Sequence, residues 1–291
     1  MKIYINEKFV EKDDAKISVF DHGFLYGYGI FEGIRAYNNR IFRLKEHLDR
    51  LWSSAKVVNI TIPISKKELE RNIIKTLIVN KLSDSYIRLI VTRGCGDLGL
   101  DPRKCIGVPS IIIITDTVSL YENELYEKGM KIITATTRRL RQDSLSPNIK
   151  SLNYLNNILA KMEAIQNGVL EALMLNSEGY VVECTTDNIF LVKNGILYTP
   201  SGSDGALIGI TRDAVIELAK NKLKILVKEC RITMYDVYTS DECFLTGTAA
   251  EIIPIISVDS RQIADGKPCK ITLKLIKEFK NLTRLTGTPI R

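Results

Sequence analysis

Two kinds of apolar periodicity occur in both halves of this chain, and together they constrain its fold more than any other feature. Apolar residues at every second position predict half-buried strands, and apolar residues spaced by three and four predict helices. The two kinds do not follow each other in the regular order of a barrel or a doubly wound sheet. We therefore expect an α+β fold of two mixed domains, residues 1–115 and 129–291, connected by a polar linker at residues 116–128.

The clearest local signals fix several elements within these domains. Ser65, with Glu68 three residues on, matches a capping box at the start of a helix. Asn194-Gly195 lies between two apolar runs and predicts a hairpin, and Asn38-Asn39 is interpreted in the same way. The expected strands cover residues 2–6, 17–21, 30–37, 41–42, 85–92, 110–115, 131–137, 171–175, 188–192 and 224–230, and the other expected helices cover residues 44–58, 151–167, 211–221 and 270–280.

Charge and cysteine usage argue against several classes of protein. The net charge is +7, but the cations stand among acids, as in Ser65–Arg71, so we expect no nucleic-acid partner; a surplus of cations also suits acidic small molecules. The six cysteines form no C-x-x-C pair and only two histidines occur, so we expect no metal site, and reduced thiols in a cytoplasm. No apolar run is long enough to span a membrane, and the N-terminus lacks the apolar region of a signal peptide.

The segment Gly94–Gly99 matches the dinucleotide-binding pattern G-x-G-x-x-G and follows an expected strand. That pattern requires a helix directly after the glycines, because the helix N-terminus holds the pyrophosphate. Here Leu100-Asp101-Pro102 interrupts any helix, and another strand is expected by Ser110, so there is no room for one. We therefore interpret the segment as a glycine-rich loop between strands.

Three segments carry residues suited to catalysis or anion binding. Lys150 precedes a predicted helix and is followed by polar and aromatic residues; a Schiff-base lysine needs such a partly desolvated position, although most lysines are solvated. Gly209–Asp213 opens a helix, which offers a phosphate cradle or simply a cap by Thr211. Leu245–Glu251 offers small residues and backbone N–H groups, which suit a carboxylate or an ordinary tight turn.

Two single charges extend this set. Glu183 follows the apolar pair Val181-Val182 and could keep a pyridine nitrogen protonated, or be a surface charge at a strand edge. Arg50 could hold a phosphate with its planar guanidinium, or pair with Glu46 one helical turn away. For each residue alone, the second interpretation is the ordinary one.

Taken in order, seven motifs resemble the fold-type IV aminotransferases that depend on pyridoxal 5′-phosphate (PLP), and among these the branched-chain amino-acid aminotransferases. The resemblance runs from about Lys2 to Lys280, and although each motif is short, seven in the family's order and spacing are specific. It implies two domains with the PLP site between them. The motifs are Asp21–Arg35, Glu46–Arg50, Tyr86–Arg88, Lys150–Tyr154, Glu183–Phe190, Gly209–Asp213 and Thr246–Glu251.

The resemblance implies a cofactor role for each matching position. Lys150 would hold PLP as a Schiff base and move the substrate proton. Glu183 would pair with the pyridine nitrogen, Tyr154 would hydrogen-bond the ring oxygen O3′, and Leu207 would pack on the ring face. The residues implied to hold the phosphate are Arg50, Ile210, Thr211 and Thr248.

The substrate positions follow from the same resemblance. Tyr86 would bind the α-carboxylate together with the backbone of Thr248 and Ala249, and Arg88, at the end of the same motif, is a further implied substrate-binding residue. One pocket must accept both a leucine and a glutamate side chain, so it needs an apolar wall and a cation at its rim. The residues implied to line it are Tyr26, Phe31, Gly33 and Arg35, with Arg35 at the γ-carboxylate of glutamate.

The implied reaction is a ping-pong transfer of the amino group from L-leucine, L-isoleucine or L-valine to 2-oxoglutarate. Family members are homodimers or larger, and Gly94–Pro102 is the loop expected to complete the neighbour's pocket. Ile114–Val118 lacks the aromatic and proline residues that many relatives carry there. A D-amino-acid aminotransferase, an aminodeoxychorismate lyase and a non-catalytic PLP-binding protein are the alternatives; Phe31–Arg35 disfavours the first two, and no catalytic position is missing.

Overall fold

The structure, a computed structural model, describes residues 1–117 and 120–291 and consists of two compact units. Unit 1 comprises Met1–Val118, Ile149–Asn153 and Thr283–Arg291, and unit 2 comprises Ser119–Asn148 and Tyr154–Leu282. The expected second domain runs without interruption from residue 129, whereas two of its segments fold with unit 1. Val118 and Ser119, in the expected linker, lie outside the described residues, and helix α4 (Asn123–Lys128) fills the end of that linker.

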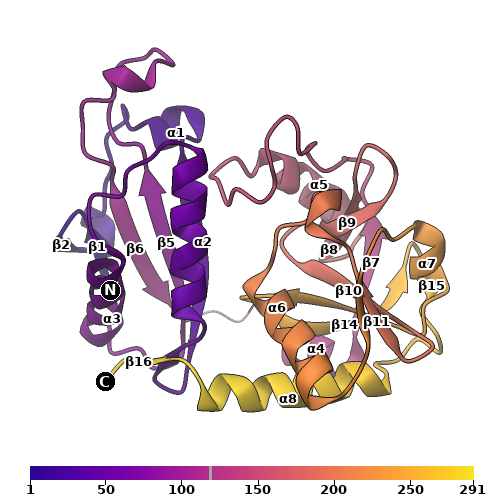
Figure 1. Ribbon diagram of the computed structural model, residues 1–291. Helices are drawn as coiled ribbons and strands as arrows, with labels where there is room; N and C mark the ends of the chain where they lie inside the picture. Colours follow the sequence, from indigo (N-terminus) through magenta and orange to yellow (C-terminus); the bar gives the residue numbers. More distant parts are fainter. Residues whose placement is uncertain (118–119) are drawn as a thin grey trace. The chain divides into compact units, whose positions relative to one another are not determined.

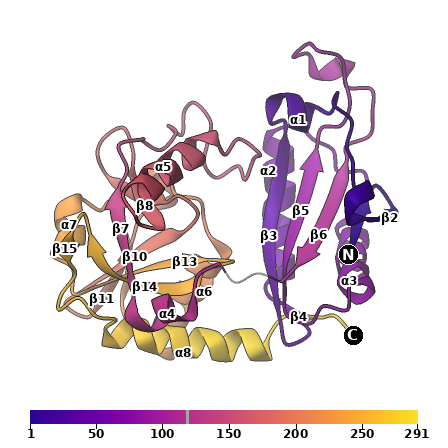
Figure 2. The same ribbon diagram turned by 180° about the vertical axis from the view of Figure 1, so that it is seen from behind.

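Unit 1 is built on an antiparallel sheet with the strand order β16-β4-β3-β5-β6-β1-β2 (Figures 1 and 2). Its strands are β1 (Lys2–Ile5), β2 (Lys8–Glu11), β3 (Gly29–Tyr37), β4 (Arg40–Ile41), β5 (Ser85–Thr92), β6 (Ile111–Asp116) and β16 (Thr288–Pro289). Its helices are α1 (His22–Tyr26), α2 (Leu44–Val57) and α3 (Lys66–Val79), with 3-10 turns at Lys12–Asp14 and Pro102–Lys104.

Helices α2 and α3 pack against one face of this sheet. Alternate residues of β3, among them Ile30 and Ile34, are fully buried against apolar residues of the two helices such as Leu51 and Ile73. Each buried aliphatic side chain contributes about 1.5–3 kcal/mol of hydrophobic free energy. The period of two in the strand and the spacing of three and four in the helices therefore produce this core together.

A short extended segment from the middle of the chain lies along β3. Phe31 donates its N–H to the carbonyl of Lys150 at 2.9 Å, and Leu152 donates to the carbonyl of Gly29 at 2.9 Å. An isolated bridge joins Ile30 to Ser151. This pairing corrects the predicted helix 151–167, which begins only at Leu155, because Ser151 and Leu152 pair with the strand instead.

Unit 2 contains a mixed sheet with the strand order β12-β11-β10-β13-β14-β7-β8-β9, and β15 pairs with β14. Its strands are β7 (Met130–Thr134), β8 (Glu171–Leu175), β9 (Val181–Cys184), β10 (Asn188–Lys193), β11 (Ile196–Thr199), β12 (Val227–Glu229), β13 (Glu242–Gly247), β14 (Glu251–Val258) and β15 (Arg261–Gln262). Besides α4, its helices are α5 (Leu155–Gln166), α6 (Ile210–Glu217), α7 (Met234–Tyr238) and α8 (Lys270–Leu285), whose residues from Thr283 on are assigned to unit 1, with a 3-10 turn at Gly202–Asp204 and a π-helical turn at Leu218–Lys222.

Most predicted elements are confirmed, and the α+β class is correct. The hairpins β3–β4 and β10–β11 turn at Asn38-Asn39 and Asn194-Gly195, where all four residues have positive φ. Ser65 caps α3 by accepting from the N–H of Glu68 at 3.2 Å. The elements that the sequence missed include β2, α1, β9, α7 and the long strand β14. The predicted strand 17–21 is wrong: Asp21 instead caps α1 by accepting from the N–H of Gly23 at 2.7 Å.

Candidate active site

Lys150 lies in the extended segment beside β3, within unit 1. Its backbone N–H donates to the hydroxyl of Ser54 on α2 at 3.2 Å. Its Nζ atom lies 4.7 Å from the centroid of the Phe31 ring, and the side chain is half-buried. The segment is thus fixed by backbone pairing on one strand and by a hydroxyl on one helix, so the lysine starts from a defined position.

The substrate positions on β3 and β5 share one face of the unit 1 sheet. Gly33 is the register partner of Arg88, and Arg35 is the partner of Tyr86, so their side chains project from the same side. The guanidinium carbon of Arg88 lies 4.5 Å from the centroid of Phe31 and 5.4 Å from that of Tyr86. A Cβ atom on Gly33 would lie 2.1 Å from the Tyr86 hydroxyl, so glycine is needed to leave that hydroxyl in place.

Tyr26 and Arg35 have other neighbours within unit 1. The Tyr26 hydroxyl donates to the carbonyl of Leu98, and its ring stands edge-on to His22 at 5.1 Å. Arg35 places its guanidinium carbon 5.1 Å from the centroid of the Tyr37 ring. Tyr26 therefore ties helix α1 to the glycine-rich loop after β5, and Arg35 stacks beside an aromatic ring on its own strand.

Arg50 pairs with Glu32 of β3 rather than with Glu46. Its Nε and Nη2 atoms donate to the two Glu32 oxygens at 2.8 and 2.7 Å, and His47 Nδ1 lies 2.8 Å from Glu32. Glu46 pairs with Arg43 instead. Burial alone would raise the pKa of Glu32, but the charge and hydrogen bonds of Arg50 and the bond from His47 lower that pKa to about 2. Burial also lowers the pKa of His47, against the effect of the Glu32 carboxylate.

Glu183 is a buried carboxylate in unit 2, not a surface charge at a strand edge. Its Oε1 atom lies 2.8 Å from Nη2 of Arg139. Its Oε2 atom accepts from the N–H of Leu207 at 3.0 Å and from the Asn188 amide at 3.2 Å. Three donors therefore satisfy a carboxylate whose side chain is only 7% exposed, as a buried anion requires.

The first turn of α6 meets the requirements of an anion cradle. Gly209 is its N-cap and supplies no side-chain cap, so Thr211 does not cap this helix as the ordinary interpretation had it. The N–H groups of Ile210 and Thr211 belong to the first turn, whose donors have no partner inside the helix. A Cβ atom on Gly209 would lie 2.0 Å from Oδ1 of Asn188, the same residue that bonds Glu183.

The turn between β13 and β14 holds Thr248 and Ala249, both half-buried. The Thr246 hydroxyl at its start is buried and has no hydrogen-bond partner among the described residues. A Cβ atom on Gly247 would lie 1.8 Å from Oδ1 of Asp187. Burial and, next to it, the charge of Glu171 raise the pKa of Asp187 to about 7.

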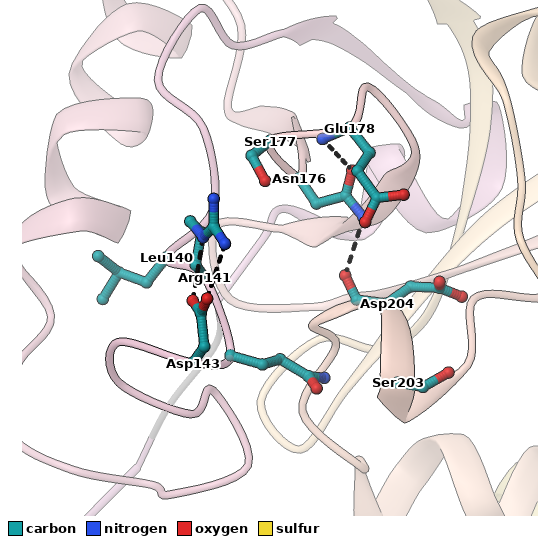
Figure 3. A pocket seen from close by; sticks show the side chains of 9 residues that line it. Leu140, Arg141, Asp143, Asn176, Ser177, Glu178, Ser203 and Asp204 are labelled. Carbon is teal, nitrogen blue, oxygen red and sulfur yellow. Dashed lines mark hydrogen bonds and ion pairs between the residues drawn. The ribbon is translucent and has the colours of Figure 1, made fainter.

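A pocket of about 320 Å³ in unit 2 contains none of the predicted site residues (Figure 3). Asn176 donates to the carbonyl of Asp204 at 3.2 Å and accepts from the N–H of Glu178 at 3.0 Å. Arg141 pairs with Asp143 at 2.7 Å on the opposite side. Because these polar groups bond to one another, we assign this pocket no role.

The structure brings the predicted residues together in two groups, one in each unit. Unit 1 carries Lys150, Arg50 and the β3–β5 positions, and unit 2 carries Tyr154, Glu183, Leu207, the α6 cradle and the Thr248–Ala249 turn. Four polar residues in contact with them were missed: Glu32, His47, Arg139 and Asn188. Glu32, His47 and Asn188 lie inside the motifs, but no local signal identifies the partners that these residues have in the fold.

In the part of the chain that the structure describes, no cluster of histidine, cysteine, aspartate and glutamate could hold a metal ion. The described helices also include none with the length and apolar content needed to cross a membrane.

Comparisons with known proteins identify the family. A family model described as amino-transferase class IV matches residues 29–258. A Methanocaldococcus jannaschii protein with the provisional name branched-chain-amino-acid aminotransferase is 53% identical over 100% of this chain and 99% of its own length. A D-alanine aminotransferase of Listeria monocytogenes is 37% identical over 99% of this chain and 98% of its own.

The fold agrees with a solved member of the same family. The Escherichia coli branched-chain amino acid aminotransferase is 34% identical and superimposes with a TM-score of 0.94, over 97% of this chain and 94% of that one. The resemblance deduced from the seven motifs is therefore confirmed. This chain belongs to the class IV aminotransferases, the fold-type IV family.

Proposed function

We propose that this protein is a PLP-dependent branched-chain amino-acid aminotransferase, which exchanges the amino group between L-leucine, L-isoleucine or L-valine and 2-oxoglutarate. One observation carries the proposal. Asn188 bonds the Glu183 carboxylate through Nδ2, and its Oδ1 atom lies against Gly209 at the N-terminus of α6. A buried anion suited to a pyridine nitrogen and a cradle suited to a phosphate thus adjoin within one unit.

The residues present fit PLP. The uncapped first turn of α6 and the unpartnered Thr246 hydroxyl are donors that a phosphate would satisfy. The phosphate would be held by Arg50, Ile210, Thr211 and Thr248, while Tyr154 would bond O3′ and Leu207 would cover the ring. When bound, the cofactor supplies the electron sink for the amino-group transfer.

Lys150 is the residue we propose to carry the covalent bond to the cofactor and to move the substrate proton. Its amine lies at an aromatic ring, Phe31, and its backbone is fixed to β3 and α2. Lysine amines become nucleophilic where water is partly excluded. The rigid segment would hold the Lys150 amine in place while it moves the substrate proton from one atom to another.

The β3–β5 face is the proposed substrate wall. Phe31 supplies apolar surface and Gly33 leaves room for the Tyr86 hydroxyl, which with the Thr248–Ala249 backbone would bind the α-carboxylate. Arg88 stacks between Phe31 and Tyr86 and would hold both rings in position. Tyr26 and Arg35 would complete the pocket, with Arg35 available to the γ-carboxylate of glutamate.

A homodimer or larger homo-oligomer is the proposed assembly. The loop after β5 and helix α1 expose apolar side chains that include Phe24, Leu98, Leu100 (78% exposed), Ile106 (94% exposed) and Val108. An apolar surface of this extent marks an interaction site. A second copy would cover it, and the Gly94–Pro102 loop would then complete the neighbour's pocket. The cysteines, all free, suit a cytoplasmic location.

D-Amino-acid transamination is the second candidate, because a relative 37% identical to this chain is named D-alanine aminotransferase. The test is the visible absorbance of the purified PLP-loaded protein before and after L-leucine or D-alanine. We expect L-leucine alone to remove the yellow band and 2-oxoglutarate to restore it. Conversion by D-alanine alone would assign the D-specific reaction, and no conversion by either would favour a lyase or a non-catalytic protein. Lys150→Ala should remain folded and lose turnover.

A further inference from the structure

We propose that Arg139 is a positioning residue that holds Glu183 as an anion aligned with the cofactor's ring nitrogen. The inference rests on the proposed function, since Glu183 meets a ring nitrogen only if PLP binds here. No motif of the sequence includes Arg139. Its assignment comes from its place in a buried hydrogen-bonded network of unit 2.

The first step is the geometry around the Arg139 guanidinium. Nη2 lies 2.8 Å from Oε1 of Glu183, and Nη1 donates to Oδ1 of Asn157 on α5 at 2.7 Å. The Asn157 amide donates in turn to the carbonyl of Thr185 at 2.7 Å. Thr185 follows Glu183 by two residues, so the network leaves the end of β9 and returns to it. The guanidinium is therefore fixed on two sides.

The second step is burial. The Arg139 side chain is 8% exposed and that of Glu183 is 7% exposed, so water screens their interaction weakly. Arg139 Nε is buried and has no hydrogen-bond partner among the described residues. An unsatisfied buried donor lowers stability, and an apolar side chain of similar volume would avoid that loss. Stability alone therefore gives a weak reason for an arginine at this position.

The third step is the proton. A cation beside a carboxylate favours the ionised form, and Leu207 and Asn188 favour it further by donating to Oε2. With Glu183 held as an anion, a proton shared with a pyridine nitrogen stays on the nitrogen. Removal of the Arg139 charge would move that proton toward Glu183 and weaken the electron sink. Loss of the guanidinium would also release one oxygen of the carboxylate.

The test compares Arg139→Met, which keeps an apolar stem, with Arg139→Lys, which keeps the charge. PLP affinity of the apoprotein is measured by equilibrium dialysis, and the visible band of the bound cofactor is titrated with pH. A ring nitrogen without its proton withdraws less charge from the Schiff base that Lys150 would form with the cofactor, so that Schiff base keeps its own proton to higher pH. We therefore expect the midpoint of the visible-band titration to rise by about one pH unit in Arg139→Met. PLP affinity should fall about tenfold, and kcat for L-leucine should fall about tenfold with little change in KM. Arg139→Lys should restore most of each loss.

An unchanged titration midpoint and PLP affinity in a folded Arg139→Met protein would overturn the inference. If that variant does not fold, Asn157→Leu decides, because it keeps Arg139 and removes the partner of Nη1. A smaller shift in the same direction is then expected, and no shift is the contrary result. Failure of the wild-type protein to bind PLP, or a Lys150→Ala protein with an unaltered spectrum, would instead reject the proposed function.

Discussion

Glu32 accepts two hydrogen bonds from one edge of the Arg50 guanidinium, at 2.8 Å from Nε and 2.7 Å from Nη2. This paired contact fixes the plane of the group and directs its other edge away from β3. Glu32→Gln keeps the shape but removes the charge, so Arg50 should become less ordered. We expect PLP affinity to fall about tenfold, measured by equilibrium dialysis of the apoprotein. Glu46→Gln, whose carboxylate pairs with Arg43 instead, is the matched control and should bind PLP like the wild type.

The same pair gives the stability a defined dependence on pH. The folded pKa of Glu32, about 2, lies below its ordinary value of 4.5, so the pair stabilises the fold above pH 4.5. That contribution, on the order of 3 kcal/mol, is lost as pH falls from about 4.5 toward 2. Denaturant unfolding of wild type and Glu32→Gln should differ most near pH 6 and least near pH 3. A difference that stays constant over this range would contradict the assignment.

Asp187 should give the folding stability the opposite dependence on pH. Its folded pKa, about 7, lies above its ordinary value of 3.8, so the protonated acid is favoured in the fold. The contribution of the protonated Asp187 side chain to the stability of the fold is fully present below pH 3.8 and is lost as pH rises through 7. Asp187→Asn cannot ionise, so we expect it to gain on the order of 4 kcal/mol over wild type at pH 8.5 and little at pH 4. Thermal unfolding at both pH values measures this, and a wild type equally stable at both would count against it.

Gly209→Ala tests the anion cradle. The added Cβ atom would lie 2.0 Å from Oδ1 of Asn188, so either the first turn of α6 or the amide must move. We expect PLP affinity to fall at least about tenfold, because displaced N–H groups no longer converge on the phosphate. Gly107→Ala is the control, since its nearest contact would be an ordinary 3.4 Å and PLP binding should not change.

Ile106→Glu tests the proposed assembly. The side chain is 94% exposed, so the substitution costs the folded monomer little, whereas a buried charge in an interface is strongly unfavourable. Sedimentation should detect a dimer or larger species for the wild type and mainly monomer for Ile106→Glu, with reduced turnover. Val57→Glu, 65% exposed at the end of α2, should leave the assembly unchanged. A wild type that sediments as an active monomer would refute the proposal.

Elements with local signals were predictable from the sequence. Both hairpins turn at asparagine or glycine residues that tolerate positive φ, and α3 begins at its predicted cap. The placement of Lys150 was not predictable, because the segment Lys150–Leu152 pairs with β3, about 120 positions earlier, although Ser151 and Leu152 continue a helical pattern in the sequence. Strand 17–21 was predicted wrongly because its alternation is local, whereas none of the described strands pairs along it.

The candidate site shows the same limit. Lysine, glutamate and arginine positions could be carried over from short motifs, and Glu183 is buried and hydrogen-bonded as a ring partner would be. The partners of these residues could not be predicted in the same way. A contact such as the one between Arg139 and Glu183 leaves no periodic pattern and no compositional signal in the sequence. Long-range polar networks are specified by the fold, so they become visible only in three dimensions.

The segment Ile149–Asn153 has a consequence for how this protein can change over time. It is encoded within the sequence of unit 2 but folds as an edge of the unit 1 sheet, and it carries Lys150. A gene fusion or truncation at the first boundary would leave unit 1 without this edge and without the lysine. The two units therefore cannot be exchanged independently among relatives, and they must be inherited as one piece.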